Sequence, residues 1–161
     1  MTSKYAAVTG SESLFPERDY LIGQAWGDVP VSYVQDNECI NECSFLDLKI
    51  NKWEMNKRWS DRQSVEPWIR IEILKGLLID EYLENKKYPF YIDCACESLI
   101  VFELDEGGIA MDELLLLRLV SVFFTQSKVY RLTDRFEEID SRAISGLPTK
   151  EVVREKLVSC D

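Results

Sequence analysis

The sequence contains no histidine, and this absence excludes several kinds of active site. The Ser-His-Asp triad, the Cys-His pair, imidazole zinc ligation and the commonest general base all require a histidine side chain. Neither glycine-rich phosphate-binding motif, G-x-x-x-x-G-K-S/T or G-x-G-x-x-G, occurs. The single Gly-Gly pair, Gly107-Gly108, follows two carboxylates that repel phosphate, so we expect a hairpin or strand-to-helix turn there. We therefore expect a protein that is not an enzyme and that needs no cofactor.

Long apolar runs and a secretory signal are missing as well. No run reaches the roughly 18 apolar residues that span a membrane, and the most apolar segment, residues 114–124, is interrupted by Arg118. The N-terminus lacks the basic-then-apolar profile of a signal peptide. The five cysteines are odd in number and scattered, which does not suit a disulfide scaffold and fits a reducing compartment. These features predict a cytoplasmic protein without membrane contact.

Basic residues are missing from two long stretches, residues 19–48 and 88–117. The two stretches hold thirteen carboxylates, in a chain with 29 acidic and 19 basic residues and a formal net charge of −10. Folded together, they would form a surface that repels nucleic acid and anionic lipid and attracts basic proteins. The alternative is that the acids serve solubility alone, although surfaces of mixed sign are the ordinary solution to that need.

What the chain does contain is enough apolar material for a core. It has 161 residues, of which 46% are apolar, with four Trp, seven Tyr and seven Phe. A domain of this length buries about 70% of the surface of its unfolded chain. No repeat or linker divides it, so residues 1–161 are expected to form one α+β domain. We expect an antiparallel or mixed sheet of about four to six strands, packed by two largely buried helices plus C-terminal helices.

The N-terminal half is predicted to begin with a polar leader, residues 1–19, followed by a β-meander. Gly27-Asp28 is a turn dipeptide that would join two strands. In the last part of the meander, apolar Leu46, Leu48 and Ile50 alternate with polar residues, which predicts one buried face. The strands are expected at residues 20–26, 29–34 and 40–50.

Helical signals begin near Ser64, where a capping residue precedes Glu66 and Pro67. The apolar residues that follow lie almost all round a helical wheel, which predicts a largely buried helix. A second apolar helix carries acids in its first turn, and Thr149 is expected to cap the last helix. The expected elements are a helix at 64–85, a strand at 90–104, a helix at 112–125, a strand at 128–132, and helices from residue 133 or 134 to 144 and from 149 to 158.

The cysteines form two close pairs, Cys39 with Cys43 and Cys94 with Cys96. Four thiolates are able to bind zinc, but structural zinc sites place their ligands on turns. Cys94 and Cys96 lie instead in an apolar, strand-like run, where cysteine behaves as a small hydrophobic residue. We favour that interpretation and expect no metal site.

Pairs of carboxylates offer the other route to chemistry. Asp93 with Glu97, and Asp105 with Glu106, are the candidates for general acid and base or for Mg²⁺ ligands. This leaves a carboxylate-dependent metal enzyme as an alternative function. In a chain with 29 acids close spacing arises by chance, and most carboxylates are simply solvated.

One segment, residues 49–62, has the opposite character, because it combines five basic residues with Trp53 and Trp59. Basic residues with interleaved aromatics are typical of single-stranded nucleic-acid grooves, but the acidic field of the whole chain opposes nucleic acid. Three other interpretations stay open. Either the tryptophans pack under a sheet edge, or the basic residues pair with the acidic stretches, or the segment contacts a partner, since Trp and Arg are favoured interface anchors.

Acidic, small and without catalytic motifs, the chain has the profile of immunity proteins of bacterial toxin systems and of antitoxins. A nuclease active site is cationic because it binds phosphates, and an acidic protein can be steered onto it at high rate. The sequence therefore predicts a non-catalytic inhibitor that neutralises a basic toxin, a nuclease in the first instance, as a monomer or homodimer. The alternative binding function is a secretion chaperone or adaptor, with the apolar helices supplying a dimer interface.

The expected partner-binding residues are exposed acids on turns and loops of both acidic stretches, with two aromatic anchors. They are Asp28, Tyr33, Asp36, Glu38, Glu42, Trp59, Asp93, Glu97, Asp105 and Glu106.

Overall fold

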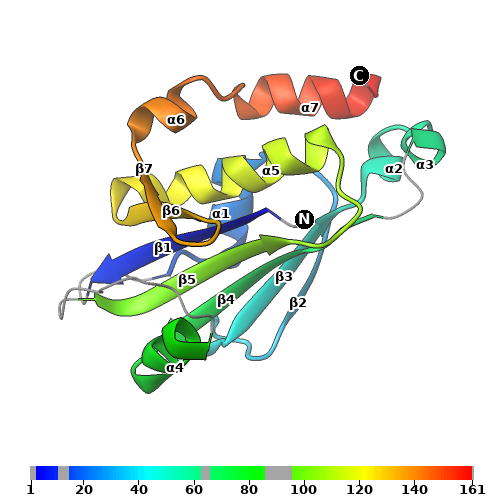
Figure 1. Cartoon of the computed structure of the whole chain (residues 1–161). Coiled ribbons are helices and arrows are strands. Elements are labelled where there is room, and N and C mark those ends of the chain that lie inside the picture. The colour runs from blue at the N-terminus through cyan, green and yellow to red at the C-terminus, as the bar shows by residue number, and fades with distance from the viewer. Residues whose placement is uncertain (1–2, 11–14, 63–65, 86–95, 161) are drawn as a thin grey trace.

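A single antiparallel sheet of seven strands, in the order β2-β3-β4-β5-β1-β6-β7, forms the centre of the computed structural model (Figure 1). The structure describes residues 3–10, 15–62, 66–85 and 96–160. All neighbouring strands pair antiparallel. β2 and β7 stand at the two ends of the strand order and are therefore the edges. The described elements are β1 (Lys4–Gly10), α1 (Arg18–Ala25), β2 (Val31–Gln35), η1 (Ile40–Glu42), β3 (Phe45–Ile50), α2 (Lys52–Met55), α3 (Trp59–Arg62), β4 (Ile69–Lys75), α4 (Leu77–Asn85), β5 (Cys96–Leu104), α5 (Ala110–Ser121), η2 (Val122–Thr125), β6 (Lys128–Leu132), β7 (Phe136–Ile139), α6 (Ser141–Ser145) and α7 (Lys150–Ser159).

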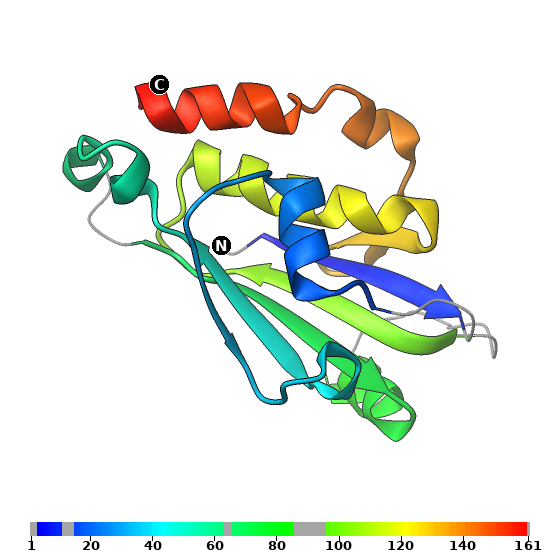
Figure 2. The same cartoon turned by 180° about the vertical axis from the view of Figure 1, so that it is seen from behind.

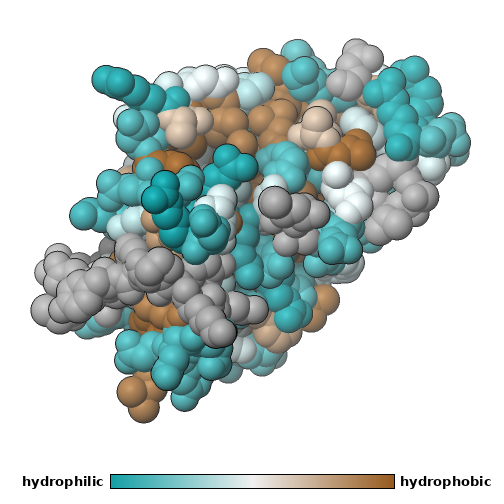
Figure 3. Space-filling model, in the orientation of Figure 1, coloured by the Kyte–Doolittle hydropathy of each residue, from teal (hydrophilic) through white to brown (hydrophobic). Residues whose placement is uncertain are grey.

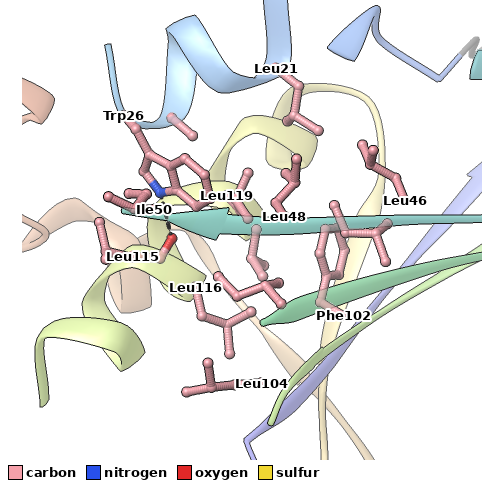
Figure 4. Packing of buried hydrophobic residues seen from close by; sticks show 14 of the residues in the cluster. Leu21, Trp26, Leu46, Leu48, Ile50, Phe102, Leu104, Leu115, Leu116 and Leu119 are labelled. Carbon is pink, nitrogen blue, oxygen red and sulfur yellow. Dashed lines mark hydrogen bonds between the residues drawn. The ribbon is translucent and has the colours of Figure 1, made fainter. Parts of the chain in front are cut away.

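One face of the sheet is covered by helices α1 and α5, with α7 beyond α5 (Figures 1 and 2). We call this the inner face. Every second residue of the central strands points into it, because successive strand side chains alternate between faces. Leu48 and Phe102 from the sheet and Leu116 and Leu119 from α5 are fully buried in this core (Figure 4).

The opposite, outer face of the sheet is covered only in part, by α4. A small apolar cluster that includes Ala6, Leu99 and Val101 lies under Ile79, Tyr82 and Leu83 of this helix. Beside α4 the outer face is mainly hydrophilic (Figure 3). Strands β3 and β4 therefore have one apolar and one charged side, as alternation predicts.

Several sequence predictions are confirmed. The class is α+β; Leu46, Leu48 and Ile50 are buried in β3; and β6 spans residues 128–132 as expected. The strand-to-helix turn at Gly107-Gly108 connects β5 to α5, and Gly107 has a positive φ of 92° that favours glycine. Helix α5 with η2 reproduces the predicted apolar helix, and Thr149 caps α7 by accepting a hydrogen bond from the backbone of Val152.

The N-terminal predictions need two corrections. Residues 1–19 are not a leader without regular structure, because Lys4–Gly10 forms β1, a strand between β5 and β6. Residues 20–26 are not a strand but belong to α1 and its C-terminal cap. Leu21 and Ala25, four residues apart, form the buried side of this helix. Gly27, with a φ of 77°, follows the helix end as glycines commonly do and does not join two strands.

The predicted helix at 64–85 is also wrong in its first half. Ile69, Ile71 and Ile73 alternate with polar residues along β4, and Gly76, with a φ of 59°, separates this strand from α4. Residues 63–65, including the expected cap Ser64, lie outside the described residues. The prediction failed because the strand and the helix, read as one segment, mimic an apolar helix.

The sheet is larger than the predicted four to six strands. Part of the expected helix at 133–144 is β7, which forms a hairpin with β6, and only Ser141–Ser145 is helical, with Asp140 as its cap. Strands β1, β4 and β7 therefore account for the additional size of the sheet. Of the two helices expected to be largely buried, only α5 is.

Candidate functional site

The loop between β2 and β3 presents three of the predicted acids together. We call residues 36–44 the edge loop, because it follows the edge strand β2. Asp36, Glu38 and Glu42 are all exposed on it. The turn η1 lies inside the loop and buries Ile40, which anchors the loop on the core. Three negative charges are thus held at one corner of the sheet.

Asp36 is fixed by hydrogen bonds within the edge loop. Its carboxylate accepts hydrogen bonds from the backbone N–H of Ser44 at 2.9 Å and from the Ser44 hydroxyl. These bonds favour the ionised form, and the pKa of Asp36 is lowered below its usual 3.8, chiefly by the Ser44 hydroxyl. The side chain of Gln35 donates to the backbone oxygen of Asn37 at 2.6 Å, which holds the start of the loop.

The titration of Asp36 gives a direct test of this geometry. We expect its carboxyl pKa, measured by NMR, to lie below 3.8, and Ser44→Ala to move it back toward that value because the hydroxyl donor is lost. A depressed folded-state pKa means that the stabilising contribution is present above the unfolded value and is lost as the pH falls through the folded value. An unchanged pKa in Ser44→Ala, with Ser60→Ala as an exposed control, would contradict the assigned hydrogen bond.

Beside the edge loop, Tyr33 lies under a guanidinium group. The side chain of Tyr33 is on the inner face and 49% exposed, and Arg18 from α1 stacks over its ring at 3.7 Å. Arg18 also donates to the side-chain oxygen of Gln35 at 2.7 Å. A depression of about 450 Å³ is lined here by Arg18, Tyr33, Gln35, Asp36, Asn37 and Glu38.

Sequence reasoning missed Arg18. The residue directly precedes the acidic stretch 19–48. Its role depends on α1 folding back against β2, and most of α1 was predicted as a strand. Its proximity to the acidic stretch is the one available signal.

Three of the other predicted acids lie away from the edge loop. In the antiparallel sheet, Asp28 precedes β2 and the pair Asp105 and Glu106 follows β5, so all three lie toward the opposite end of the strands from Asp36. Glu97 is exposed near the start of β5, which is the end of the strands where the edge loop lies, because the neighbouring Ser98 is opposite Lys75 and Lys75 donates to the Asn41 backbone oxygen. Of the described acids predicted in the second stretch, Asp105 and Glu106 are therefore the two that lie away from the edge loop.

Of the two remaining predicted residues, Trp59 was wrongly expected to contact a partner. Its side chain is 3% exposed, and its indole N–H donates to the backbone oxygen of Leu157 at 2.8 Å, so it anchors α7 and does not reach a partner. Asp93 lies outside the described residues.

A second depression, about 370 Å³, lies on the outer face. Its charges are largely compensated within the chain. Asp47 accepts two hydrogen bonds from Arg70, both at 2.8 Å, and Glu103 lies 3.6 Å from the Lys4 ammonium. The pKa of Arg70 is raised, mainly by its bond to Asp47. The lining is Val34, Asp47, Trp68, Arg70, Glu103 and Asp105.

Two of the five basic residues in the segment 49–62 form ion pairs within the protein, while Lys57, Arg58 and Arg62 are exposed. Lys52 is buried and donates to Asp112, from the second acidic stretch, at 2.5 Å. Lys49 pairs with Glu66 at 3.3 Å and lies 5.3 Å from the centre of the Trp68 ring. Intramolecular pairing with an acidic stretch is thus confirmed for Lys52. Trp59 is buried, but beside α7, to which its indole bonds, and Trp53 is 50% exposed.

Within the described ranges no three side chains of Cys, Asp or Glu gather as a metal site would require. The buried Cys43 thiol donates to the Asn37 backbone oxygen at 3.1 Å, and burial is the main cause that raises its pKa. Cys39 is exposed and free. Cys94, and with it the second predicted cysteine pair, lies outside the described side chains.

The fold thus defines an α+β protein with an acidic corner at one edge of its sheet. Comparison of the chain with protein-family models, with curated proteins and with solved structures found no match. In the part of the chain that the structure describes, no helix has the length and apolar character needed to cross a membrane.

Proposed function

We propose that this chain is a non-catalytic, acidic binding protein of the immunity or antitoxin type. It neutralises a basic toxin by protein–protein binding in the cytoplasm, and a toxin nuclease is the partner whose chemistry fits best. Nucleases carry cationic surfaces to hold phosphates, so an acidic inhibitor is attracted to them over a long range.

The observation that carries the proposal is the construction of the edge loop. Its exposed carboxylates Asp36, Glu38 and Glu42 stand on a loop fixed by hydrogen bonds and by buried Ile40. A loop that is already ordered loses little conformational entropy on binding, which favours affinity. Exposed Tyr33 lies next to these charges and supplies an aromatic contact of the kind enriched at interfaces.

The chaperone alternative relied on two apolar helices as a dimer interface. Residues 69–75 form a strand of the sheet, and the apolar side of α5 is used by the core. What this alternative retains is α4, which exposes Leu77 and Leu78. For the carboxylate-dependent enzyme, the candidates Asp105 and Glu106 are exposed on the turn after β5, and Asp93 lies outside the described residues, so it stays an alternative.

A test of the proposal begins with capture of partners on the immobilised chain and mass identification after elution with salt. We expect a folded, basic enzyme whose activity falls when this chain is added. The double variant Glu38→Lys/Glu42→Lys should slow association about 10-fold or more at low ionic strength, because electrostatic steering is lost. Asp36 is left intact since it holds the loop.

The matched control is Asp105→Lys/Glu106→Lys, which changes the net charge by the same amount at the opposite end of the strands. It should slow association much less than the edge-loop variant. Equal effects of the two variants would show that only total charge matters. An unchanged rate in the edge-loop variant would remove the loop from the binding site.

A further inference from the structure

We infer that β2 is a docking edge to which an extended, basic segment of the partner adds as an eighth strand. The inference rests on the proposed function for the basic character of the partner, and it specifies how the edge loop and the strand beside it are used. Strand addition at a free sheet edge is a known mode of peptide recognition, in which main-chain hydrogen bonds give affinity and alternate side chains give specificity.

The hydrogen-bonding phase of β2 can be derived from its register. Pro30 and Asn51 are opposite each other one step beyond the Val31–Ile50 pair, and the backbone N–H of Asn51 donates to the Pro30 oxygen at 2.9 Å. Because bonded and non-bonded pairs alternate in an antiparallel ladder, Ser32 and Val34 direct their main-chain groups toward β3.

It follows that Val31, Tyr33 and Gln35 direct their N–H and C=O groups away from the sheet. β2 ends the strand order, and among the described strands β3 alone pairs with it. Figure 2 shows the strand at the outer border of the sheet. These three residues therefore offer a short row of backbone donors and acceptors to an incoming strand.

The edge lacks the usual protection. Natural edge strands carry lysine, an internal proline or a bulge that discourages pairing. β2 has the sequence Val-Ser-Tyr-Val-Gln, with no charged residue, no proline within it and a regular register against β3. Among the described residues, its brevity and Pro30 directly before it are the protective features, and the brevity limits the added strand to about the same length.

Both faces beside the edge can receive side chains. Tyr33 on the inner face and Val34 on the outer face are each 49% exposed. An added strand would place alternate side chains next to Val34 and into the depression lined by Tyr33 and the start of the edge loop. The site thus has the apolar pair and the flanking polar pocket that a strand with alternating residues needs.

The charges select a basic segment over a second copy of this chain. Asp28 precedes β2, and Asp36 and Glu38 follow it. The basic side chains at this edge are already bonded within the chain: Arg18 stacks on Tyr33 and bonds Gln35, Lys49 pairs with Glu66, and Lys75 and Arg154 donate to the backbone oxygens of Asn41 and Asp28. Antiparallel pairing of two copies of β2 about Tyr33 would place the edge loop of one copy near Pro30 and Asp28 of the other. Acids would face acids, which is unfavourable.

The inference is tested with a defined probe, the peptide acetyl-Lys-Lys-Val-Thr-Val-Lys-Lys-amide, titrated to millimolar concentration and followed by NMR of the protein. In the free protein the amides of Val31, Tyr33 and Gln35 should exchange with solvent faster than those of Ser32 and Val34. The peptide should shift and protect the first three. The same peptide with glutamate in place of lysine should not bind.

A matched pair of variants isolates the main-chain contact. Tyr33→Pro and Tyr33→Ala both remove the ring, but only proline removes the outward N–H, which an edge strand tolerates. We expect Tyr33→Pro to bind the peptide about 5- to 10-fold or more weakly than Tyr33→Ala, because one or more main-chain hydrogen bonds are lost. If Tyr33→Pro fails to fold, peptides N-methylated at alternate residues serve instead, and one of the two methylation phases should lose binding.

The inference is wrong if the three outward amides are unaffected by the peptide, if proline and alanine at position 33 bind it equally, or if the free chain dimerises through β2. It is separable from the proposed function. One outcome is that the edge-loop variant slows association with a captured toxin, while Tyr33→Pro and Tyr33→Ala bind that toxin equally well. The inhibitor proposal then stands and strand addition fails. If the peptide binds at β2 but no captured enzyme is inhibited, strand addition stands and the inhibitor proposal fails.

Discussion

Replacing Lys52 with methionine is expected to lower the free energy of unfolding by about 3–5 kcal/mol. The Lys52 ammonium and the Asp112 carboxylate are 2.5 Å apart, and their side chains are only 3% and 5% exposed. Methionine fills a similar volume but leaves the carboxylate buried without its cation. The second oxygen of Asp112 accepts a hydrogen bond from the backbone N–H of Ile109 at the start of α5, so this helix end should loosen as well.

The measurement is urea unfolding followed by circular dichroism, with Lys57→Met as the control. Lys57 lies in the same basic segment but is exposed, so its replacement should change the unfolding free energy by less than about 0.5 kcal/mol. Adding Asp112→Asn to Lys52→Met removes the buried charge and should restore part of the loss. Equal stability of the two lysine variants would show that the buried pair does not stabilise the fold.

Local patterns were sufficient to predict several elements of the fold. β3 was recognised by its alternation, α5 by its acidic first turn and apolar length, and α7 by its capping Thr149. Each of these signals is contained within the element itself. The α+β class follows from them without knowledge of how the strands are ordered.

The failures arise where the decisive interaction is distant in sequence. β1 contains two alanines and ends in glycine, which gives a weak strand signal, and it is a strand because β5 and β6 supply its partners on both sides. β4 and α4 were predicted as one helix, because Gly76, which separates the strand from the helix, was not recognised as a boundary. The alternation of Ile69, Ile71 and Ile73 was nevertheless present and should have outweighed the helical wheel.

The site shows the same division. The acids of the edge loop could be predicted together because they are close in sequence on one connection. The positions of the acids in the second stretch could not be predicted. In an antiparallel sheet consecutive connections lie at opposite ends of the strands, and Asp112 is buried in the core. Trp59 was expected to contact a partner. It is buried instead because α7, which follows about a hundred residues later in the sequence, covers it.

Replacing Trp26 with alanine is expected to cost about 3–5 kcal/mol of unfolding free energy, comparable with the loss of the buried ion pair. Trp26 ends α1 and is 1% exposed, among Leu48, Leu119 and Ile50 (Figure 4). Its indole N–H donates to the backbone oxygen of Leu115 at 2.9 Å, which ties the end of α1 to α5. Alanine would leave a cavity where the sheet, α1 and α5 meet.

Two further variants separate the causes. Trp53→Ala removes the same side chain from a site where it is 50% exposed, so it should cost no more than about 1 kcal/mol, and a similar loss in both variants would contradict the assigned burial. Trp26→Phe keeps most of the apolar volume but not the N–H donor, and should fall between the two. Because α1 also carries Arg18, which stacks on Tyr33, Trp26→Ala should shift the Tyr33 amide resonance as well. The stability of the core and the geometry of the β2 edge are therefore linked through a single helix.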